Sequence, residues 1–510
     1  VITVNPLEEA GLKRFKNPQT ISGFLSSGTM ITDVYLKVKV NQDIALLKAI
    51  MKKLICLDNA SDGEVLDHEF IKNQTQGFEA VLDDLKKYDI QDLIEQSGVP
   101  EKEINKAVDI LKNRKKIIIC WAMGLTQHKN GVENIKECVN LLLMKGSIGK
   151  PGAGTCPVRG HSNVQGDRTV GIVHHTSPAL RDTLKNKYNF EAPTDEGLDT
   201  VHCIQAMHEG KAKVFMALGG NFLSAASDTE YTAEALSNCD LTIQVSTKLN
   251  RSHTVPGKTG IILPTLGRSE KDMKDNQKRF VTVENSMGKV HASQGVLSPA
   301  SNNLMSEPES ICRMANAVFE NDPQIKWMDY AEDYSLIRED IADVVKGFED
   351  YNKRLDDGGF YLPNNARQGD FSKLPGGRAQ FTVCRMPKHE LAEDEFLMMT
   401  IRSHDQFNTT IYGLDDRYRG VYNERRVVFM NPDDCRKLGL KKLDVVDLTS
   451  EYDGKLRRAE QFKIVPYDIP RGNLASYFPE TNVLVPINHF ADHSHTPISK
   501  SIRVRVEKKS

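Results

Sequence analysis

The chain has 510 residues, 67 of them basic and 69 acidic, so its formal net charge is −2. This length predicts about three domains, and the balanced charge lacks the basic stripe that is typical of nucleic-acid-binding proteins. No apolar run approaches the roughly 20 residues that a membrane-spanning helix needs. We therefore expect no nucleic-acid partner and no membrane span.

The first 150 residues alternate between strand and helix patterns. A β-branched strand at 1–4 ends in the turn Asn5-Pro6, and a loop rich in Gly, Ser and Thr follows at 19–34. Helical spacing of apolar residues predicts helices at 44–57, 70–87, 100–114 and 132–145. The run KIIICWA at 116–122 predicts a buried strand. This alternation favours an α/β layer with a parallel sheet.

A second α/β set follows, and the character of the chain changes near residue 376. Helices are predicted at 201–210, 230–237, 308–321 and 327–352, strands at 214–218, 241–245 and 260–263, and polar strand-like sequence at 272–295. After 376 we expect short strands at 396–401, 427–430, 444–449, 459–464 and 502–506, with one helical turn at 432–438. Short strands without long helices predict a closed or nearly closed β-barrel.

The nine cysteines are odd in number and widely spaced, without a CxxC motif. This pattern favours neither a disulfide framework nor a zinc or iron–sulfur ligand set. We expect reduced thiols, a cytoplasmic protein and no metal ligand within this chain. The opening residues VITVNP contain no initiating Met and no signal peptide. They read as an interior strand, so we expect the C-terminal portion of a longer polypeptide.

Residues 151–169, PGAGTCPVRGHSNVQGDRT, are rich in glycine and contain Arg159 and His161. Glycines let a ligand approach the backbone closely. An arginine offers a planar fork to a carboxylate or phosphate, and a histidine changes charge near neutral pH. The stretch is either an irregular connecting loop or a loop that holds a small anion, and composition alone favours neither.

Polar residues and glycines also follow four predicted strands, where parallel sheets expose the edge that ligands favour. The segments are Asn5–Leu7, Ala122–Gln127, Leu218–Ser224 and Ser246–Asn250. Alone, Asn5–Leu7 reads best as an ordinary strand-end turn and Ala122–Gln127 is a weak signal, while Ser224 or Ser227 is as readily a helix cap. Together they predict an extended nucleotide-like ligand, with Asp228 accepting hydrogen bonds from a guanine.

Residues 402–410, RSHDQFNTT, open the predicted barrel with hydrogen-bonding groups that a single Phe interrupts, and we interpret them as a ligand-lining loop. His489, His493 and His495 have a spacing that metals use, but without Cys or a paired acid we favour surface histidines. No GxSxG or HExxH motif is present, so the sequence does not support hydrolysis.

These stretches, in this order, resemble the molybdopterin-guanine-dinucleotide oxidoreductases, and within them the formate dehydrogenase-like alpha subunits of the YdeP type. The strongest pieces are 146–172 (GSIGKPGAGTCPVRGHSNVQGDRTVGI) and 402–421 (RSHDQFNTTIYGLDDRYRGV), supported by 261–272 (IILPTLGRSEKD) and 478–486 (FPETNVLVP). The resemblance implies two Rossmann-like α/β domains with parallel sheets, at 1–161 (truncated at its N-terminus) and at 162–375 (with a helical connection). It also implies a double-psi-type β-barrel that binds the molybdopterin dinucleotide, at 376–510.

The resemblance further implies a molybdenum ion held by two pterins that each carry a guanosine diphosphate tail. It also implies a [4Fe–4S] cluster whose cysteines, like the residue that ligates molybdenum, lie upstream of this chain. The cofactor-binding residues that it implies are Asn5, Met123, Gly124, Gln127, Gly220, Asn221, Ser224, Asp228, Ser246, Thr247, Lys248, Arg402, Ser403, His404, Gln406, Asn408, Thr409 and Asn482.

The resemblance places Arg159 on the arginine that faces substrate in the formate dehydrogenases of this family, and it makes Arg159 and His161 the catalytic candidates. A guanidinium can orient the carboxylate of formate for oxidation to carbon dioxide. His161 stands where the selenocysteine enzymes carry Gln, and it is either a general base or a hydrogen-bonding support. The electrons would reach an electron-acceptor protein or subunit. An oxo-transfer reductase (for example of nitrate) and a scaffold subunit that has lost the cofactor are the alternatives.

Overall fold

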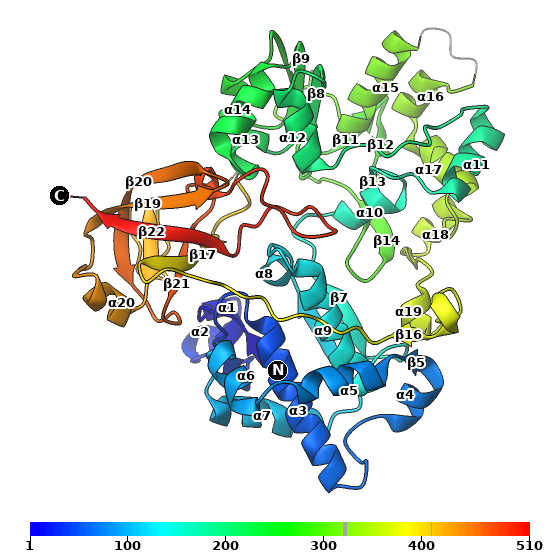
Figure 1. The fold of residues 1–510 in the computed structure, drawn as a ribbon. Helices are drawn as coiled ribbons and strands as arrows, with labels where there is room; N and C mark the ends of the chain where they lie inside the picture. The colour runs from blue at the N-terminus through cyan, green and yellow to red at the C-terminus, as the bar shows by residue number, and fades with distance from the viewer. Residues whose placement is uncertain (320–323, 410, 510) are drawn as a thin grey trace. The chain divides into compact units, whose positions relative to one another are not determined.

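The computed structural model describes residues 1–319, 324–409 and 411–509, and Figure 1 shows its fold. The described chain forms two compact units. The first unit comprises residues 1–155, 224–230 and 365–510, and the second unit comprises residues 156–223 and 231–364. Of the predicted helix at 308–321, residues 320 and 321 lie outside the described residues, as does Thr410 of the loop at 402–410.

The first unit begins with a small parallel sheet and a group of helices. Strand β1 (Ile2–Val4) pairs in parallel with β4 (Val34–Leu36). Helix α3 (Asp43–Ala60) packs against α6 (Ile90–Ser97), α7 (Glu101–Lys112) and α9 (Gly131–Met144). Helix α7 illustrates why these segments are helical. Pro100 precedes its first turn, two glutamates lie in that turn, and its apolar residues recur on one buried face.

The predicted single helix at 70–87 is wrong. The structure has α4 (His68–Gln74), the two-residue strand β5 (Thr75–Gln76) and α5 (Phe78–Lys86). The interruption lies at Gly77, whose φ of 85° is in the left-handed region. A Cβ there would stand 3.0 Å from the carbonyl oxygen of Phe381. The strand pairing of β5 with β16 (Ala379–Gln380) therefore overrides a helical pattern that is continuous in the sequence.

Two further local predictions for the first unit need correction. The predicted loop at 19–34 contains α2 (Ile21–Leu25), whose first turn is capped by the Thr20 side chain, and β3 (Thr29–Met30). The strand β6 (Ile118–Trp121) is not buried, since Ile118 is 52% exposed. Alternate residues of a strand point to opposite faces, and here only Ile117 and Ile119 meet the helical core.

The first unit also contains a closed barrel, drawn in yellow to red in Figure 1. Its strands, in order around the barrel, are β17 (Glu395–Ile401), β21 (Asn473–Tyr477), β18 (Val427–Met430), β20 (Lys455–Pro466), β19 (Val445–Tyr452) and β22 (Ile502–Lys508). The pairs β17–β21 and β18–β20 are parallel, and the other pairs are antiparallel. Helix α20 (Pro432–Lys437) follows β18.

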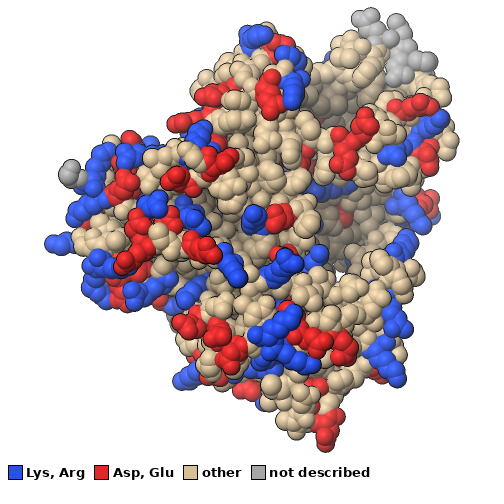
Figure 2. Space-filling view, viewed as in Figure 1, with Lys and Arg blue, Asp and Glu red and all other residues tan. Residues whose placement is uncertain are grey.

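Period-two alternation builds the barrel from two apolar layers. Phe396 and Met398 of β17 point into the barrel core, while Leu397 and Met399 on its other face pack with Leu7, just after β1. The barrel strands therefore pack on the segment that follows the first strand of the chain. On the face of the barrel that Figure 2 shows, Lys and Arg are interspersed with Asp and Glu, in agreement with the balanced charge of the chain.

The second unit contains the three-stranded parallel sheet β10–β9–β8. Its strands are β8 (Val214–Leu218), β9 (Leu241–Ser246) and β10 (Thr259–Pro264). The helices before and between these strands are α12 (Thr200–His208), α13 (Phe222–Ala225) and α14 (Thr229–Ser237), although the segment 224–230, with the end of α13 and the start of α14, belongs to the first unit. The three strands pair in parallel in the same order in which they follow one another in the chain. This arrangement matches the predicted Rossmann-like pattern.

The rest of the second unit joins short antiparallel strands to helices. The strands are β11 (Asp272–Lys274), β12 (Gln277–Arg279), β13 (Val281–Glu284), β14 (Lys289–Ser293) and β15 (Phe360–Tyr361). The helices are α10 (Val164–Thr169), α11 (Pro178–Tyr188), α15 (Glu307–Val318), α16 (Trp327–Glu332), α17 (Tyr334–Val344) and α18 (Tyr351–Asp356). The predicted helix at 327–352 is thus three helices, since Asp333 and Val345 are extended.

The fold class is confirmed: the chain is α/β with parallel sheets and a closed barrel of six strands. The division into domains at 161 and 375 remains a prediction. Short elements complete the described chain, namely α1 (Ala10–Lys13), β2 (Arg14–Phe15), α8 (Met123–Thr126), β7 (Gly154–Pro157), η1 (Arg251–Thr254), α19 (Asn365–Gln368), η2 (Pro375–Gly377) and η3 (Asn482–Leu484). None of the helices in the described ranges has the length and apolar character to cross a membrane.

Candidate functional site

The glycine-rich loop leads into the short helix α10 of the second unit. Both catalytic candidates, Arg159 and His161, are exposed. The backbone N–H of Arg159 donates to Ser286 Oγ (3.3 Å), and its Nε donates to Gln165 Oε1 (3.4 Å). The two Nη atoms of Arg159 make no hydrogen bond to a described residue. The planar fork of this guanidinium therefore remains available to an anion.

Glu284, at the end of β13, holds this loop in place. Its two carboxylate oxygens accept hydrogen bonds from Gln165 Nε2 and Thr169 Oγ1, each at 2.6 Å. Its backbone N–H donates to Asn163 Oδ1 (3.0 Å). A Cβ at Gly166 would collide with the same Asn163 oxygen, so this close packing requires glycine. The sequence reasoning missed Glu284 because it lies more than 110 positions from the loop.

The sheet of the second unit brings two of the predicted strand-end segments together. Leu218 of β8 pairs with Val245 of β9, so Gly220 and Asn221 follow one strand beside Ser246 at the end of the other. Asn221 is buried and accepts from Ser252 Oγ (3.1 Å), whereas Thr247 and Lys248 are exposed. The space where a Cβ of Gly220 would stand is open, and its φ is 75°. This edge therefore combines accessible backbone with hydroxyl and ammonium groups.

The segment 224–230 packs with the barrel in the first unit. Asn482 donates from Nδ2 to the carbonyl oxygens of Ser224 (2.7 Å) and Ala226 (3.1 Å), and its own carbonyl accepts from Asp228 N (3.1 Å). Asn482 thus fixes the path of the backbone around Asp228. Ser224, Asp228 and Asn482 were all predicted to bind the cofactor, and the structure shows that Asn482 holds the backbone of the other two.

Asp228 is a buried carboxylate with one oxygen committed to protein. Arg457, on β20, donates to Asp228 Oδ2 from Nη2 (2.7 Å) and Nε (3.2 Å), and Ile487 N donates to the same oxygen (3.3 Å). Oδ1 makes no hydrogen bond to a described residue and remains an acceptor. The predicted role of Asp228 as a guanine acceptor is compatible with Oδ1 alone. Arg457, which the sequence reasoning missed, is the ion-pair partner of this buried carboxylate.

The strand ends of β1 and β6 lie in the first unit. The side chain of Asn5 accepts from Leu7 N (3.4 Å), so it stabilises the turn after β1. Met123 and Gly124 lie in the one-turn helix α8 after β6, with Gln127 directly after it, and a Cβ at Gly124 would have no atom within 4 Å. Protein packing therefore does not require a glycine at position 124. The open space beside it is compatible with a ligand that lies close to the backbone.

His128, a residue that the sequence reasoning missed, fixes the loop that contains Gly124. Its Nε2 contacts the Gly124 carbonyl oxygen (2.8 Å), and its Nδ1 contacts Ser501 Oγ (3.1 Å). Because a carbonyl only accepts, Nε2 carries the proton and Nδ1 accepts from the serine. Burial lowers the pKa of His128 to about 3, so this histidine is neutral.

The loop at 402–409 folds around the buried guanidinium of Arg425. That group donates to Ser403 Oγ (2.9 Å) and Gln406 Oε1 (3.0 Å) and forms a two-point ion pair with Glu480. Arg402 donates to Asn408 Oδ1 (2.8 Å). Thr409 is buried beside them. The side chains of Ser403 and Gln406 in the predicted ligand-lining loop therefore bond to protein, and these hydrogen bonds fix the conformation of the loop.

His404 joins a network of four charged groups in the first unit. Its Nδ1 contacts Asp416 Oδ1 (2.8 Å), and Arg419 donates to Asp416 Oδ2 (2.7 Å) and to Glu9 Oε1 (2.6 Å). His404 Nε2 lies 3.1 Å from Glu9 Oε2, but it is poorly aligned for a hydrogen bond, so this contact is an ion pair. The hydrogen bond with Asp416, followed by the contact with Glu9, raises the pKa of His404 to about 9.

Burial opposes the ionisation of Asp416, but its hydrogen bond with His404 and the charge of Arg419 hold its pKa well below the usual range. The four groups therefore sum to zero charge near neutral pH. Glu9 follows β1, and the other three lie between β17 and β18. The network thus connects the segment after the first strand of the chain to the loop that opens the barrel. The side chain of His404, which the sequence assigned to the cofactor, contacts Asp416 and Glu9 in this network.

Of the three C-terminal histidines, His489 stacks on Tyr452 with ring centroids 4.2 Å apart, and burial lowers its pKa to about 4. His493 is exposed, and His495 packs against Phe490. The predicted site residues thus fall into separate groups: the α10 loop and the β8–β9 edge in the second unit, and the α8 loop, the 224–230 segment and the 402–409 loop in the first.

Comparisons with known proteins assign a family to these features. The family profile described as "Molybdopterin oxidoreductase" matches residues 31–300, and the one described as "Molydopterin dinucleotide binding domain" matches residues 396–506. An uncharacterized oxidoreductase of Mycobacterium tuberculosis is 45% identical over 514 residues, which cover 99% of this chain and 66% of that protein. Protein YdeP of Escherichia coli is 41% identical over 525 residues, covering 99% and 68%.

More distant similarities cover less sequence or show the fold alone. The alpha subunit of an F420-dependent formate dehydrogenase of Methanococcus maripaludis is 30% identical over 246 residues, 47% of this chain and 35% of that protein. The structure of acetylene hydratase from Pelobacter acetylenicus has a TM-score of 0.65 at 15% identity, covering all of this chain and 74% of that chain. The chain spans about two thirds of the length of the curated relatives that it matches over 99% of its residues.

Proposed function

The chain belongs to the molybdopterin oxidoreductase family and contains a molybdopterin dinucleotide-binding domain at 396–506, and from this premise we propose that it oxidises formate or a similarly small anion. In the proposed reaction, formate is oxidised to carbon dioxide, a proton and two electrons. The similarity to a formate dehydrogenase alpha subunit supports this choice among the family's reactions.

The described residues fit a molybdenum–bis(molybdopterin guanine dinucleotide) group in three respects. Gly124 and Gly220 have open space where a side chain would stand, and Asp228, a buried residue, bonds Arg457 and Ile487 through Oδ2. Asp228 would accept from a guanine, and Ser246, Thr247 and Lys248 would contact ribose or phosphate. When bound, this group would supply the two-electron acceptor. The proposal also includes a [4Fe–4S] cluster, whose cysteine ligands would not be among the residues of this sequence.

The observation that carries the proposed substrate is the state of Arg159. Its guanidinium is exposed, Gln165 orients it, and both Nη atoms are available. A carboxylate can accept two parallel hydrogen bonds from such a fork, which orients formate by its oxygens and leaves the C–H bond directed away from the arginine. His161 lies two residues along the same loop and would take the proton that the oxidation releases.

The test uses the full-length protein from a host that makes the cofactor, assayed with formate and with nitrate and an artificial electron carrier. Loss of two charged hydrogen bonds in Arg159→Ala should cost about 3–6 kcal/mol, so kcat/KM should fall ~10²–10⁴-fold. Molybdenum and pterin contents should stay unchanged. Arg168→Ala, which changes an exposed arginine on the neighbouring helix α10, is the matched control and should keep its activity.

Three outcomes contradict the proposal. Formate activity in Arg159→Ala within threefold of the parent would show that this arginine does not orient substrate. Loss of pterin from that variant would make Arg159 a cofactor ligand instead. Nitrate reduction without formate oxidation in the parent protein would favour oxo-transfer.

A further inference from the structure

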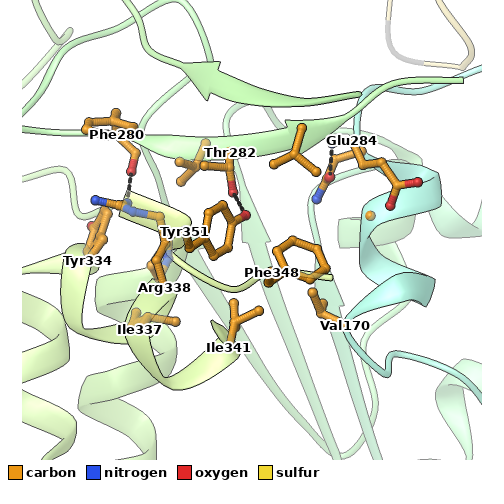
Figure 3. A pocket seen from close by; sticks show the side chains of 15 residues that line it. Val170, Phe280, Thr282, Glu284, Tyr334, Ile337, Arg338, Ile341, Phe348 and Tyr351 are labelled. Atoms are coloured by element: carbon orange, nitrogen blue, oxygen red, sulfur yellow. Dashed lines mark hydrogen bonds between the residues drawn. The ribbon is translucent and has the colours of Figure 1, made fainter. Parts of the chain in front are cut away.

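The second unit contains a cavity of about 180 Å³ between helix α10 and helices α17 and α18 (Figure 3). Phe280, Phe348 and Tyr351 contribute aromatic rings to its wall, and Ile337 and Ile341 contribute branched apolar side chains. An engineered protein cavity of about 150 Å³ with a similar apolar lining binds benzene. The cavity therefore has room for one six-membered ring with a small substituent.

Arg338, on α17, brings a positive charge to this apolar cavity. The residue is only 8% exposed. Its Nε donates to Asn352 Oδ1 (2.7 Å), its Nη1 donates to the carbonyl oxygen of Phe280 (3.1 Å), and the guanidinium stacks 4.3 Å from the centre of the Phe280 ring. Both acceptors are neutral. A guanidinium has five N–H donors, so most of its hydrogen-bonding capacity is left over.

No carboxylate of the described residues forms an ion pair with Arg338, and its Nη2 makes no hydrogen bond to them. Burial lowers the pKa of this arginine, although the charges of Asp333, Asp356 and Glu339, none within ion-pair distance, oppose that shift. The buried Arg279 in the same unit shows the usual solution, since Asp272 and Glu309 both pair with it. Arg338 differs because it lines the cavity and has no such pair.

The other polar groups of the wall are already paired with protein. The hydroxyl groups of Thr282 and Tyr351 bond each other at 2.8 Å. Glu284 lies at the opposite end of the cavity from Arg338 in Figure 3, and Gln165 and Thr169 donate to its carboxylate. The cavity therefore has a cationic end at Arg338, an apolar middle, and at the other end the Glu284 carboxyl group bonded to neutral donors. A molecule that matches the cationic end and the apolar middle has a carboxylate on a compact ring, with its ring between that carboxylate and Glu284.

We propose that this cavity is a binding site for a small aromatic monocarboxylate, with Arg338 as its counter-ion and the rings of Phe280, Phe348 and Tyr351 around its apolar body. This site is separate from the proposed dinucleotide-binding segments. Because Asn163 and Gly166 also line the cavity, occupancy adds contacts beneath helix α10, which follows Arg159. Binding should therefore slow hydrogen exchange at 163–169.

The test is calorimetric titration of the full chain with benzoate, which needs no enzyme activity. Benzamide supplies the ring without the charge, and acetate supplies the charge without the ring. Both should bind at least about tenfold more weakly than benzoate, because each lacks one of the two contacts. Arg338→Met should weaken benzoate binding about tenfold or more. Arg354→Met is the matched control, since that arginine also stacks on a ring (Phe360, 3.6 Å) but does not line the cavity.

A second variant keeps the proposal testable if Arg338→Met unfolds. Ile341→Phe places a larger apolar group on the cavity wall and should abolish benzoate binding while the thermal midpoint stays the same or rises. Equal affinity for benzoate and benzamide, or unchanged benzoate affinity in a folded Arg338→Met, would overturn the role of the guanidinium. A benzoate Kd weaker than about 10 mM for the parent chain would show that the cavity holds only water.

Discussion

Loss of the proton on His404 should loosen the first unit at alkaline pH. The pKa of His404 is about 9 in the folded chain, against an ordinary value of 6.5. A group with a raised folded pKa contributes its full stability below the unfolded value, and it loses this contribution as the pH rises through the folded one. The stability that His404 adds is therefore present below pH 6.5 and disappears by roughly pH 9–10.

The magnitude follows from the same two values. A difference of about 2.5 pH units corresponds to about 3 kcal/mol at 1.36 kcal/mol per unit. The side chain of His404 is 17% exposed, so water screens part of this interaction. We therefore expect about 1–3 kcal/mol. Lys500, whose pKa burial lowers to about 8, titrates in the same window with the opposite sign, so the parent profile alone is insufficient.

The assay compares urea unfolding of the parent and His404→Gln across this pH range. Trp121 lies in the first unit and Trp327 in the second, and these are the two tryptophans of the chain. In a Trp327→Phe background the fluorescence therefore reports on the first unit. His404→Gln should be less stable by about 1–3 kcal/mol at pH 6.5 and equal to its parent near pH 10. A constant difference across the range would refute the ionised network.

Two further predictions concern packing and charge in the first unit. Arg457→Met leaves the Asp228 carboxylate buried without its counter-ion, so thermal unfolding should show a loss of about 3–5 kcal/mol in stability. The double variant Arg457→Met/Asp228→Asn should recover part of this stability. An Arg457→Met protein as stable as the parent would contradict the contribution of this ion pair. Gly77→Ala should cost about 1–3 kcal/mol in urea unfolding because of its φ of 85° and the nearby Phe381 carbonyl. Gly11→Ala, with open space at its Cβ, should be neutral, and equal effects of the two would contradict the strained turn.

The sequence predicts those parts of the fold that depend on local pattern. The apolar spacing of α7 is visible directly, and so is the edge formed after β8 and β9, because adjacent parallel strands must end on the same side. Strand β21 was missed, since its five residues are all buried and the sequence NLASY shows no alternation. The break at Gly77 was missed because the strand pairing that causes it is with residues 379–380.

The site was predictable to the extent that its residues follow strands. The sequence placed Gly220 and Ser246 at strand ends, and the structure brings those ends together. The groups that hold the loops come from distant positions. Glu9 lies almost 400 residues from His404, and Arg457 reaches Asp228 from a barrel strand. In the sequence, Arg457 and Arg338 look like ordinary solvated charges, and only tertiary packing buries them.

Gly124→Leu tests the central claim, that these loops bind a molybdopterin dinucleotide, most directly. The space beside Gly124 is open, so without cofactor a side chain there should leave the thermal midpoint close to that of the parent. With cofactor present, we predict that the purified full-length variant contains less guanine nucleotide and molybdenum per chain than the parent, while Gly11→Leu contains the normal amount. A Gly124→Leu protein with full cofactor content, or a parent protein without guanine nucleotide, would contradict the account.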